Sequence, residues 1–187
     1  MNEKQIVERV RQDSENFWEI IDIYEEKLLR YVQRIGDMPY EEAENIVQDI
    51  FIKVYKNINS YDSSFPFSSW IYRIAHNEVI DFFRKNEKNK NNISLSDEDY
   101  KNLISNLTDW KTPHKNLEKT DLRECVRKCI NMLPLEYKEI MILKFIEEKW
   151  YEEIGDILKM PLWTVWTMIN RAKKQLRENL EKLHCNF

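Results

Sequence analysis

Glycine is scarce in this sequence of 187 residues, where only Gly36 and Gly155 occur. A phosphate-cradling loop or a dinucleotide-binding fold needs several glycines within one short stretch, so both classes are excluded. Prolines number only five, whereas Glu, Lys, Ile and Leu are common. This composition predicts an all-α protein, because glycine and proline are the residues that helices tolerate least.

Cysteine is also scarce. An odd number of cysteines, three, argues against a disulfide scaffold and for a reducing compartment. Cys125 and Cys129 share a face of an expected helix, but His114 and His184 have no metal-ligand spacing to them. We therefore expect buried thiols in a core, no metal site and no cofactor.

Long apolar runs are missing, and the longest are as short as IMIL at 140–143. The sequence therefore predicts no export signal, no membrane span and a cytoplasmic protein. It also contains no nucleophile–base pair and no metal cluster, so we expect no catalytic residues and no enzyme.

Charge is unevenly distributed, although the net charge is only −4. Residues 162–187 hold five basic and two acidic side chains, whereas residues 118–161 hold eight basic and ten acidic ones. A basic helix that follows an acidic body indicates a nucleic-acid partner for the C-terminal segment.

Apolar spacing predicts helices over 16–35, from Pro39 to about Lys56, and from about Phe67 to Lys85. Residues 86–115 are polar and weakly periodic, which is typical of a flexible linker. Further helices are expected over 117–132, 134–147, 151–158 and 162–183. The fold class is thus two small helical domains joined by a linker. The second has the proportions of a helix-turn-helix, in which Gly155 lets two helices approach closely.

The helix expected after Pro39 has an apolar stripe and a polar face. The stripe comprises Ile46, Val47, Ile50, Phe51 and Val54. The other face carries Asn45, Gln48, Asp49 and Ile52, spaced i, i+3, i+4 and i+7. Spacing alone favours an ordinary solvated face, and a docking surface with an exposed Ile as anchor is the alternative.

Aromatic and basic side chains gather in the next segment. Its aromatic residues are Tyr61, Phe65, Phe67, Trp70 and Tyr72, and its polar and basic residues are Arg73, His76, Asn77 and Arg84. Aromatic residues beside cations suit the stacking of unpaired bases along a phosphate backbone. Composition alone supports equally well a segment whose aromatic residues are simply core.

The stretch EEAENIVQDIFIKVYKNINSYDSSFPFSSWIYRIAHNEVIDFFRK resembles the polymerase-binding and promoter-melting region of bacterial extracytoplasmic-function sigma factors, in the sigma-70 family. The stretch LPLEYKEIMILKFIEEKWYEEIGDILKMPLWTVWTMINRAKKQLR resembles their second conserved region. The resemblance covers about residues 15–88 and 117–182. It implies a region 2 domain over 1–88, a linker over 89–116 and a region 4 helix-turn-helix domain over 117–187.

The resemblance also implies partners and site residues. The expected partners are the RNA polymerase core, promoter DNA and an anti-sigma factor, with no membrane partner. The polymerase contacts are expected at the clamp helices of the largest subunit and at the flap of the second-largest subunit. Core binding is assigned to Asn45, Gln48, Asp49 and Ile52. Contacts to the minus-ten element are assigned to Tyr61, Phe65, Trp70, Arg73, His76, Asn77 and Arg84. Helix-turn-helix contacts to DNA are assigned to Thr164, Thr167, Asn170, Arg171, Lys173 and Lys174.

The helix-turn-helix departs from the family pattern. Family members usually carry a hydroxyl residue at Trp150, where it caps a helix with Glu153, and glycine at Lys159, where the turn is left-handed. They usually carry Gly, Lys and Arg where Trp163, Trp166 and Met168 stand. These tryptophans lie opposite the apolar stripe, where DNA is expected.

Three interpretations of the tryptophans are open. In the first, the tryptophans recognise an unusual upstream DNA element through thymine methyls and DNA shape. In the second, they bind a protein partner. In the third, the segment was altered by design, and the DNA-recognition helix is changed or disabled. We favour a retained fold with altered upstream recognition. Two other functions are also open: a stand-alone helix-turn-helix regulator, and a protein-binding helical module without upstream DNA recognition.

Overall fold

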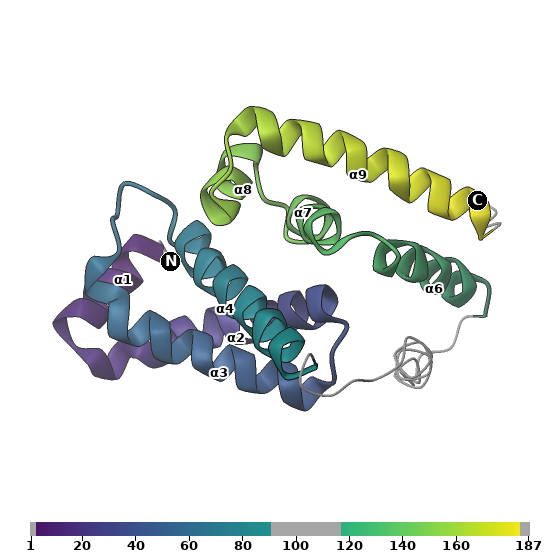
Figure 1. Ribbon diagram of the computed structural model, residues 1–187. Coiled ribbons are helices and arrows are strands. Elements are labelled where there is room, and N and C mark those ends of the chain that lie inside the picture. The colour runs from purple at the N-terminus through teal and green to yellow at the C-terminus, as the bar shows by residue number, and fades with distance from the viewer. Residues whose placement is uncertain (1–2, 91–116, 184–187) are drawn as a thin grey trace.

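The computed structural model describes residues 3–90 and 117–183 (Figure 1). Within these ranges it contains eight α-helices, two short 3-10 helices and no strand. The α-helices are α1 (Glu3–Gln12), α2 (Trp18–Gly36), α3 (Tyr40–Asn57), α4 (Phe67–Lys90), α6 (Leu117–Asn131), α7 (Leu135–Phe145), α8 (Tyr151–Leu158) and α9 (Leu162–Lys182). The 3-10 helices are η1 (Ser14–Phe17) and η2 (Ile58–Ser60). The all-helical fold class is thereby confirmed.

Two elements differ from the sequence prediction. Helix α1 was not expected, yet its apolar residues Ile6, Val7 and Val10 are buried in the hydrophobic core. Helix α4 continues to Lys90 instead of ending near Lys85. No glycine or proline occurs between these two residues, so nothing in the chain stops the helix. The predicted linker, residues 89–116, lies almost entirely outside the described residues.

Helices α1 to α4 form the first group, coloured purple to teal in Figure 1. Helix α3 packs against both α2 and α4, and α1 packs against the start of α2 and against η2. All five apolar residues predicted to form the α3 stripe are buried. The polar face of α3 therefore points to solvent, as its register requires.

Helices α6 to α9 form the second group, in which α9 packs on α6, α7 and α8. The apolar residues Ile154, Ile157, Val165 and Ile169 are buried between α8 and α9. A Cβ atom on Gly155 would lie 2.9 Å from the Met160 carbonyl oxygen, which confirms that a small residue is needed there. Lys159 adopts the left-handed conformation (φ 55°, ψ 45°) predicted for this turn, without the glycine that suits it.

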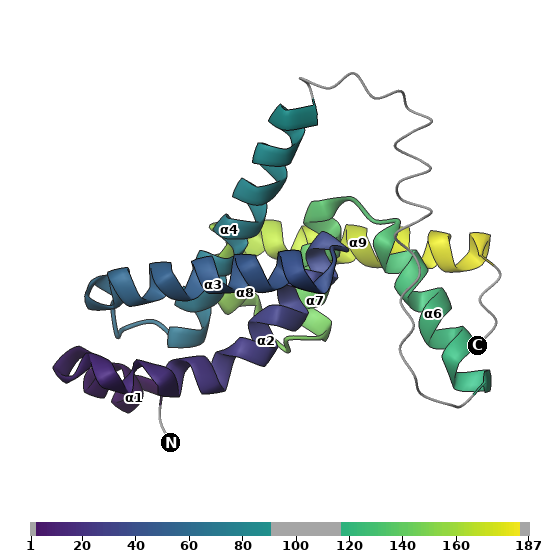
Figure 2. The same cartoon turned by 90° about the horizontal axis from the view of Figure 1, so that it is seen from below.

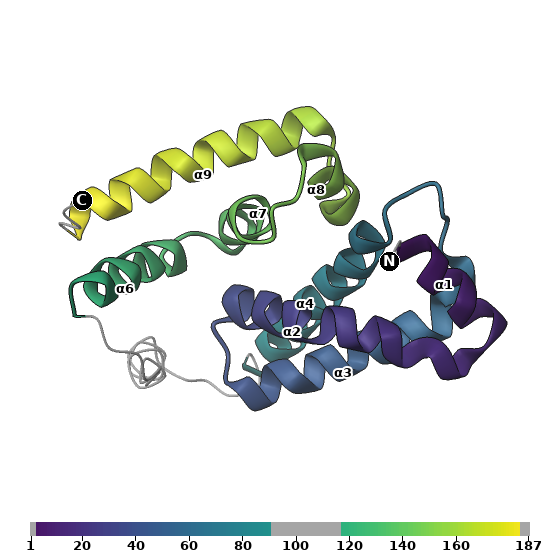
Figure 3. The same cartoon turned by 180° about the vertical axis from the view of Figure 1, so that it is seen from behind.

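The two groups contact each other, as the view from behind shows (Figure 3). Helix α4 packs against α8, and α2 packs against α7. Seen from below, the far end of α4 extends beyond this contact (Figure 2). Among the described residues, the α7 side of the contact contains two buried charged residues, Lys138 and Glu139. The contact is therefore partly polar.

The two described cysteines, Cys125 and Cys129, differ in state. Cys129 is buried, as expected, and burial raises the pKa of its thiol. Cys125 is half-buried and disulfide-bonded, so the expectation that it is a free thiol was wrong. In the ranges that the structure covers, no helix is both long and apolar enough to cross a membrane.

Candidate functional site

The polar face of α3 is open to solvent along its whole length. Asn45, Gln48 and Asp49 are exposed, and the Ile52 side chain is 50% exposed. Tyr55, one turn further on, is exposed too, and the edge of its ring meets Phe17 at a centroid distance of 5.1 Å. Tyr55 was missed in the sequence, although its i+3 spacing from Ile52 continues the face. The result is a flat strip of short polar groups with an apolar end.

A cavity of about 300 Å³ lies where the loop after α3 meets the start of α4. It is lined by Ser60, Tyr61, Asp62, Phe65, Trp70 and Arg73. The Asp62 carboxylate accepts a 2.9 Å hydrogen bond from the Ser64 amide, which closes the loop and lowers the pKa of Asp62. Phe65 is exposed at this loop, and Trp70 is half-buried. Four predicted minus-ten residues thus surround one space, which is large enough to admit a base.

Tyr61 has a different place from the one predicted. It was expected to face DNA, but it is only 3% exposed and packs edge-on against Phe67 at 5.2 Å. Its hydroxyl donates a 2.5 Å hydrogen bond to the Phe65 carbonyl, and burial raises its pKa. Tyr61 therefore packs beneath the loop as part of the core, and its ring is not exposed for stacking with a base.

A second cavity of about 240 Å³ adjoins the first along α4. Asn77 and Ile74 line it together with Lys53 and Asn57 from the end of α3. Ser60 and Trp70 line both cavities, so Trp70 stands between them. Arg73 and Asn77 consequently each face one of two adjoining hollows on α4, and their role as DNA contacts stays a prediction.

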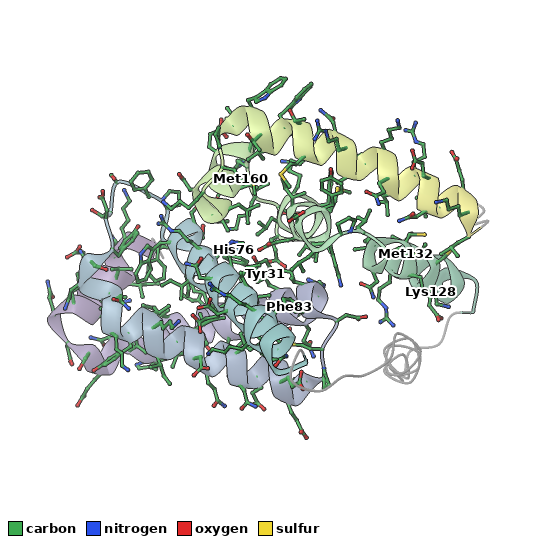
Figure 4. All side chains as sticks on the ribbon, in the orientation of Figure 1. Tyr31, His76, Phe83, Lys128, Met132 and Met160 are labelled. Atoms are coloured by element: carbon green, nitrogen blue, oxygen red, sulfur yellow. The ribbon has the colours of Figure 1, made fainter. Side chains whose placement is uncertain are left out.

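The two other predicted minus-ten residues lie elsewhere. His76 lines neither cavity, and its Nδ1 atom is 2.7 Å from Oε1 of Glu139 on α7. The same oxygen accepts a 2.7 Å hydrogen bond from the Tyr31 hydroxyl on α2 (Figure 4). The prediction that His76 lies along DNA is therefore wrong for this arrangement of the two groups. Arg84 is exposed further along α4 and pairs with Asp81.

The N-terminal turns of α9 present the two tryptophans to solvent. Trp163 is 70% exposed and Trp166 is 52% exposed, and their rings stack with centroids 5.7 Å apart. The Thr167 hydroxyl donates to the Trp163 carbonyl at 2.9 Å and is thus occupied within the helix, while Thr164 is half-buried. Four exposed polar residues continue along the helix: Asn170, Arg171, Lys173 and Lys174.

The start of α8 keeps half of a capping box. The Glu153 carboxylate accepts a 2.8 Å hydrogen bond from the Trp150 amide. The Trp150 indole cannot return the bond, because its nitrogen is a donor only. Lys144 instead lies over that indole, 5.3 Å from its centroid. The predicted loss of the side-chain cap is confirmed.

Comparisons with known proteins agree with this geometry. Residues 20–89 match the family model described as Sigma-70 region 2, and residues 123–176 match the model of Sigma-70, region 4. The chain is 34% identical to the ECF RNA polymerase sigma factor SigW of Bacillus subtilis, over 98% of both chains. It is 30% identical to the ECF RNA polymerase sigma-E factor of Haemophilus influenzae, over 98% of this chain and 97% of the relative.

Solved structures give the same fold. The sigma factor RpoE in complex with the anti-sigma factor NepR from Bartonella quintana superposes with a TM-score of 0.68, at 19% identity. That match covers 89% of this chain and 97% of the other. CnrH in complex with the cytosolic domain of CnrY superposes with a TM-score of 0.67 at 17% identity, over 95% and 96% of the two chains. At these identities the similarity is one of fold.

Proposed function

The chain belongs to the extracytoplasmic-function sigma factors of the sigma-70 family, and from that premise we propose which surfaces perform its function. As an alternative sigma factor it directs transcription initiation. The exposed face of α3 binds core RNA polymerase, and the cavity beside Trp70 holds an unpaired promoter base. The single observation that carries this proposal is the meeting of Phe65, Trp70 and Arg73 around one hollow that is large enough to admit a base.

Residues 1–88 act as the region 2 domain and residues 117–187 as the region 4 domain, with residues 89–116 as the linker. Asn45, Gln48 and Asp49 make polar contacts to the clamp helices of the largest polymerase subunit, and Ile52 adds an apolar contact to the same helices. Region 4 contacts the flap of the second subunit. The protein is a binding subunit without catalysis of its own, and it acts in the cytoplasm, where RNA polymerase works.

Base capture at the cavity makes promoter melting possible without ATP. Flipping a base out of the duplex costs a few kcal/mol. Stacking on aromatic side chains returns roughly 1–3 kcal/mol per base. Arg73 adds a cation for the backbone phosphate beside the captured base. Asn77, in the neighbouring hollow, faces the next part of the strand.

Helix α9 contacts the upstream element with a changed set of side chains. Arg171, Lys173 and Lys174 are exposed and supply cations for phosphates. The first turns offer Trp163 and Trp166 in place of hydrogen-bonding groups, so base reading there differs from that of helices with polar first turns. An anti-sigma factor is the expected regulatory partner, since similar folds were solved in complexes with such proteins.

The proposal is tested by mixing the chain with sigma-free core polymerase and a random promoter library, and by sequencing the transcripts. Transcripts that share two-part promoters support it, and no product despite core binding contradicts it. Asp49→Lys should weaken core binding in a pull-down by reversing charge on the α3 face. Asp22→Lys, a charge reversal at another exposed residue, on α2, is the matched control and should bind core normally. Equal binding by both variants would remove α3 from the interface.

A further inference from the structure

We infer that Arg11 in α1 is a positioning residue for base capture, because it holds the loop that forms the cavity beside Trp70. The inference rests on the proposed role of that cavity. Residue 11 lies before residue 20, where the match to region 2 begins. The capture site thus depends on a helix outside the matched segment.

The contact joins the end of α1 to Ile58, the first residue of η2, and to Tyr61, which directly follows η2. The Arg11 guanidinium donates to the Ile58 carbonyl through Nε at 3.3 Å and Nη2 at 3.2 Å. Nη2 also donates to the Tyr61 carbonyl. The guanidinium carbon lies 5.8 Å from the centre of the Tyr61 ring, over its face. One side chain therefore fixes the carbonyls at both ends of the short turn that leads into the loop.

The chemistry of the contact favours arginine. The Ile58 carbonyl accepts a 3.3 Å hydrogen bond from the Tyr61 amide, and its second lone pair can accept from the guanidinium. Carbonyls near the end of a helix carry partial negative charge, so a cation there is favourable. A guanidinium presents several donors in a rigid plane and can serve two carbonyls at once. A lysine keeps the charge but has no such planar fork, so it should hold the two carbonyls less firmly.

The consequence reaches the cavity through Tyr61. Arg11 holds the Tyr61 backbone, and the Tyr61 hydroxyl holds the Phe65 carbonyl on the far side of the loop. Tyr61 and Phe65 both line the cavity, whereas Arg11 does not. Without Arg11, Tyr61 and Phe65 are held less firmly in place, so the cavity is less well formed before DNA arrives.

The test uses Arg11→Gln and Arg11→Lys in the full chain, assembled with core polymerase. The matched control is Glu8→Gln, which removes the 3.1 Å ion pair of Arg11 with Glu8 but leaves both carbonyl contacts in place. The probe is a fluorescent single strand carrying the minus-ten element of a promoter that the wild-type holoenzyme selects from the random library. We expect about tenfold weaker binding for Arg11→Gln, a smaller loss for Arg11→Lys and none for Glu8→Gln.

A second probe separates positioning from general destabilisation. It carries an abasic site at the position whose base contributes most to wild-type binding. Arg11→Gln and wild type should bind this probe equally, because neither can gain from capture. Equal losses on both probes, or a Glu8→Gln variant as weak as Arg11→Gln, would overturn the inference. A wild-type holoenzyme that selects no promoter would instead overturn the proposed function.

Discussion

The Tyr31 hydroxyl donates a 2.7 Å hydrogen bond to the Glu139 carboxylate and so joins α2 to α7 across 108 residues of sequence. Glu139 is only 4% exposed, and the same oxygen also meets His76 from α4. A buried carboxylate is costly unless hydrogen-bond donors surround it. Both donors to this acid come from the first helical group, so the second group depends on the first to bury it.

Tyr31→Phe should loosen the contact between the two groups. The variant removes one donor from a buried carboxylate, which costs about 1–3 kcal/mol. We expect a lower midpoint of urea unfolding and a larger radius of gyration in small-angle X-ray scattering. Tyr24→Phe is the control, because Tyr24 is bonded to Glu3 within the first group. If both variants keep the wild-type radius, this bond does not hold the groups together.

Stability should fall at alkaline pH. Burial raises the pKa of Tyr24, Tyr31 and Tyr72 in the folded protein, and the nearby carboxylates Glu3, Glu139 and Glu147 raise it further. Unfolded tyrosines ionise near about pH 10, so above that pH the unfolded chain binds fewer protons than the folded one. The stabilisation is complete below this pH and is lost as pH rises, by up to about 1.4 kcal/mol per pH unit for each tyrosine.

The measurement is the free energy of urea unfolding between neutral pH and pH 11, followed by far-ultraviolet circular dichroism. Tyr31→Phe should show a shallower decline than wild type, because one of the tyrosines with a raised pKa is gone. Tyr40→Phe changes an exposed tyrosine and should leave the decline unchanged. A flat wild-type profile above pH 10 would contradict the expectation.

The sequence predicted the helices and their buried faces well, for a physical reason. Side chains at i, i+3 and i+4 lie on one face, so the α3 stripe and the exposed Gln48 and Asp49 follow from spacing alone. The exposure of Trp163 and Trp166 followed from the same periodicity. Spacing reports which face is buried, but not which element buries it.

The remaining features depend on contacts that are distant in sequence. His76 was assigned to DNA through the family resemblance, but a buried acid 63 residues away occupies it. Tyr61 was assigned to stacking because it is aromatic, yet it lies under the loop. Arg11 was missed because the carbonyls that it holds lie about 50 residues further along the chain. Its neighbours Ile6, Val7 and Val10 show helical spacing, which was the available signal for α1.

Lys159→Gly should stabilise the helix-turn-helix. Lys159 has a φ of 55°, where a Cβ atom is unfavourable, and glycine removes that strain at about 1 kcal/mol. Lys159→Ala retains the Cβ atom and should give no such gain. The measurement is the midpoint of urea unfolding for both variants. A gain of equal size in both would show that loss of the lysine charge, and not backbone strain, is responsible.

Trp166→Lys should increase the salt dependence of promoter binding. The side chain is exposed on the face of α9 that carries Asn170 and Lys173, so a lysine there adds a cation near the DNA backbone. Each added phosphate contact steepens the slope of log K against log salt by about one unit. Holoenzyme binding to a selected promoter fragment is measured across a series of KCl concentrations. Met132→Lys, which adds the same charge at an exposed position after α6, is the control and should leave the slope unchanged. Equal slopes for wild type and Trp166→Lys would mean that the first turns of α9 do not approach phosphates.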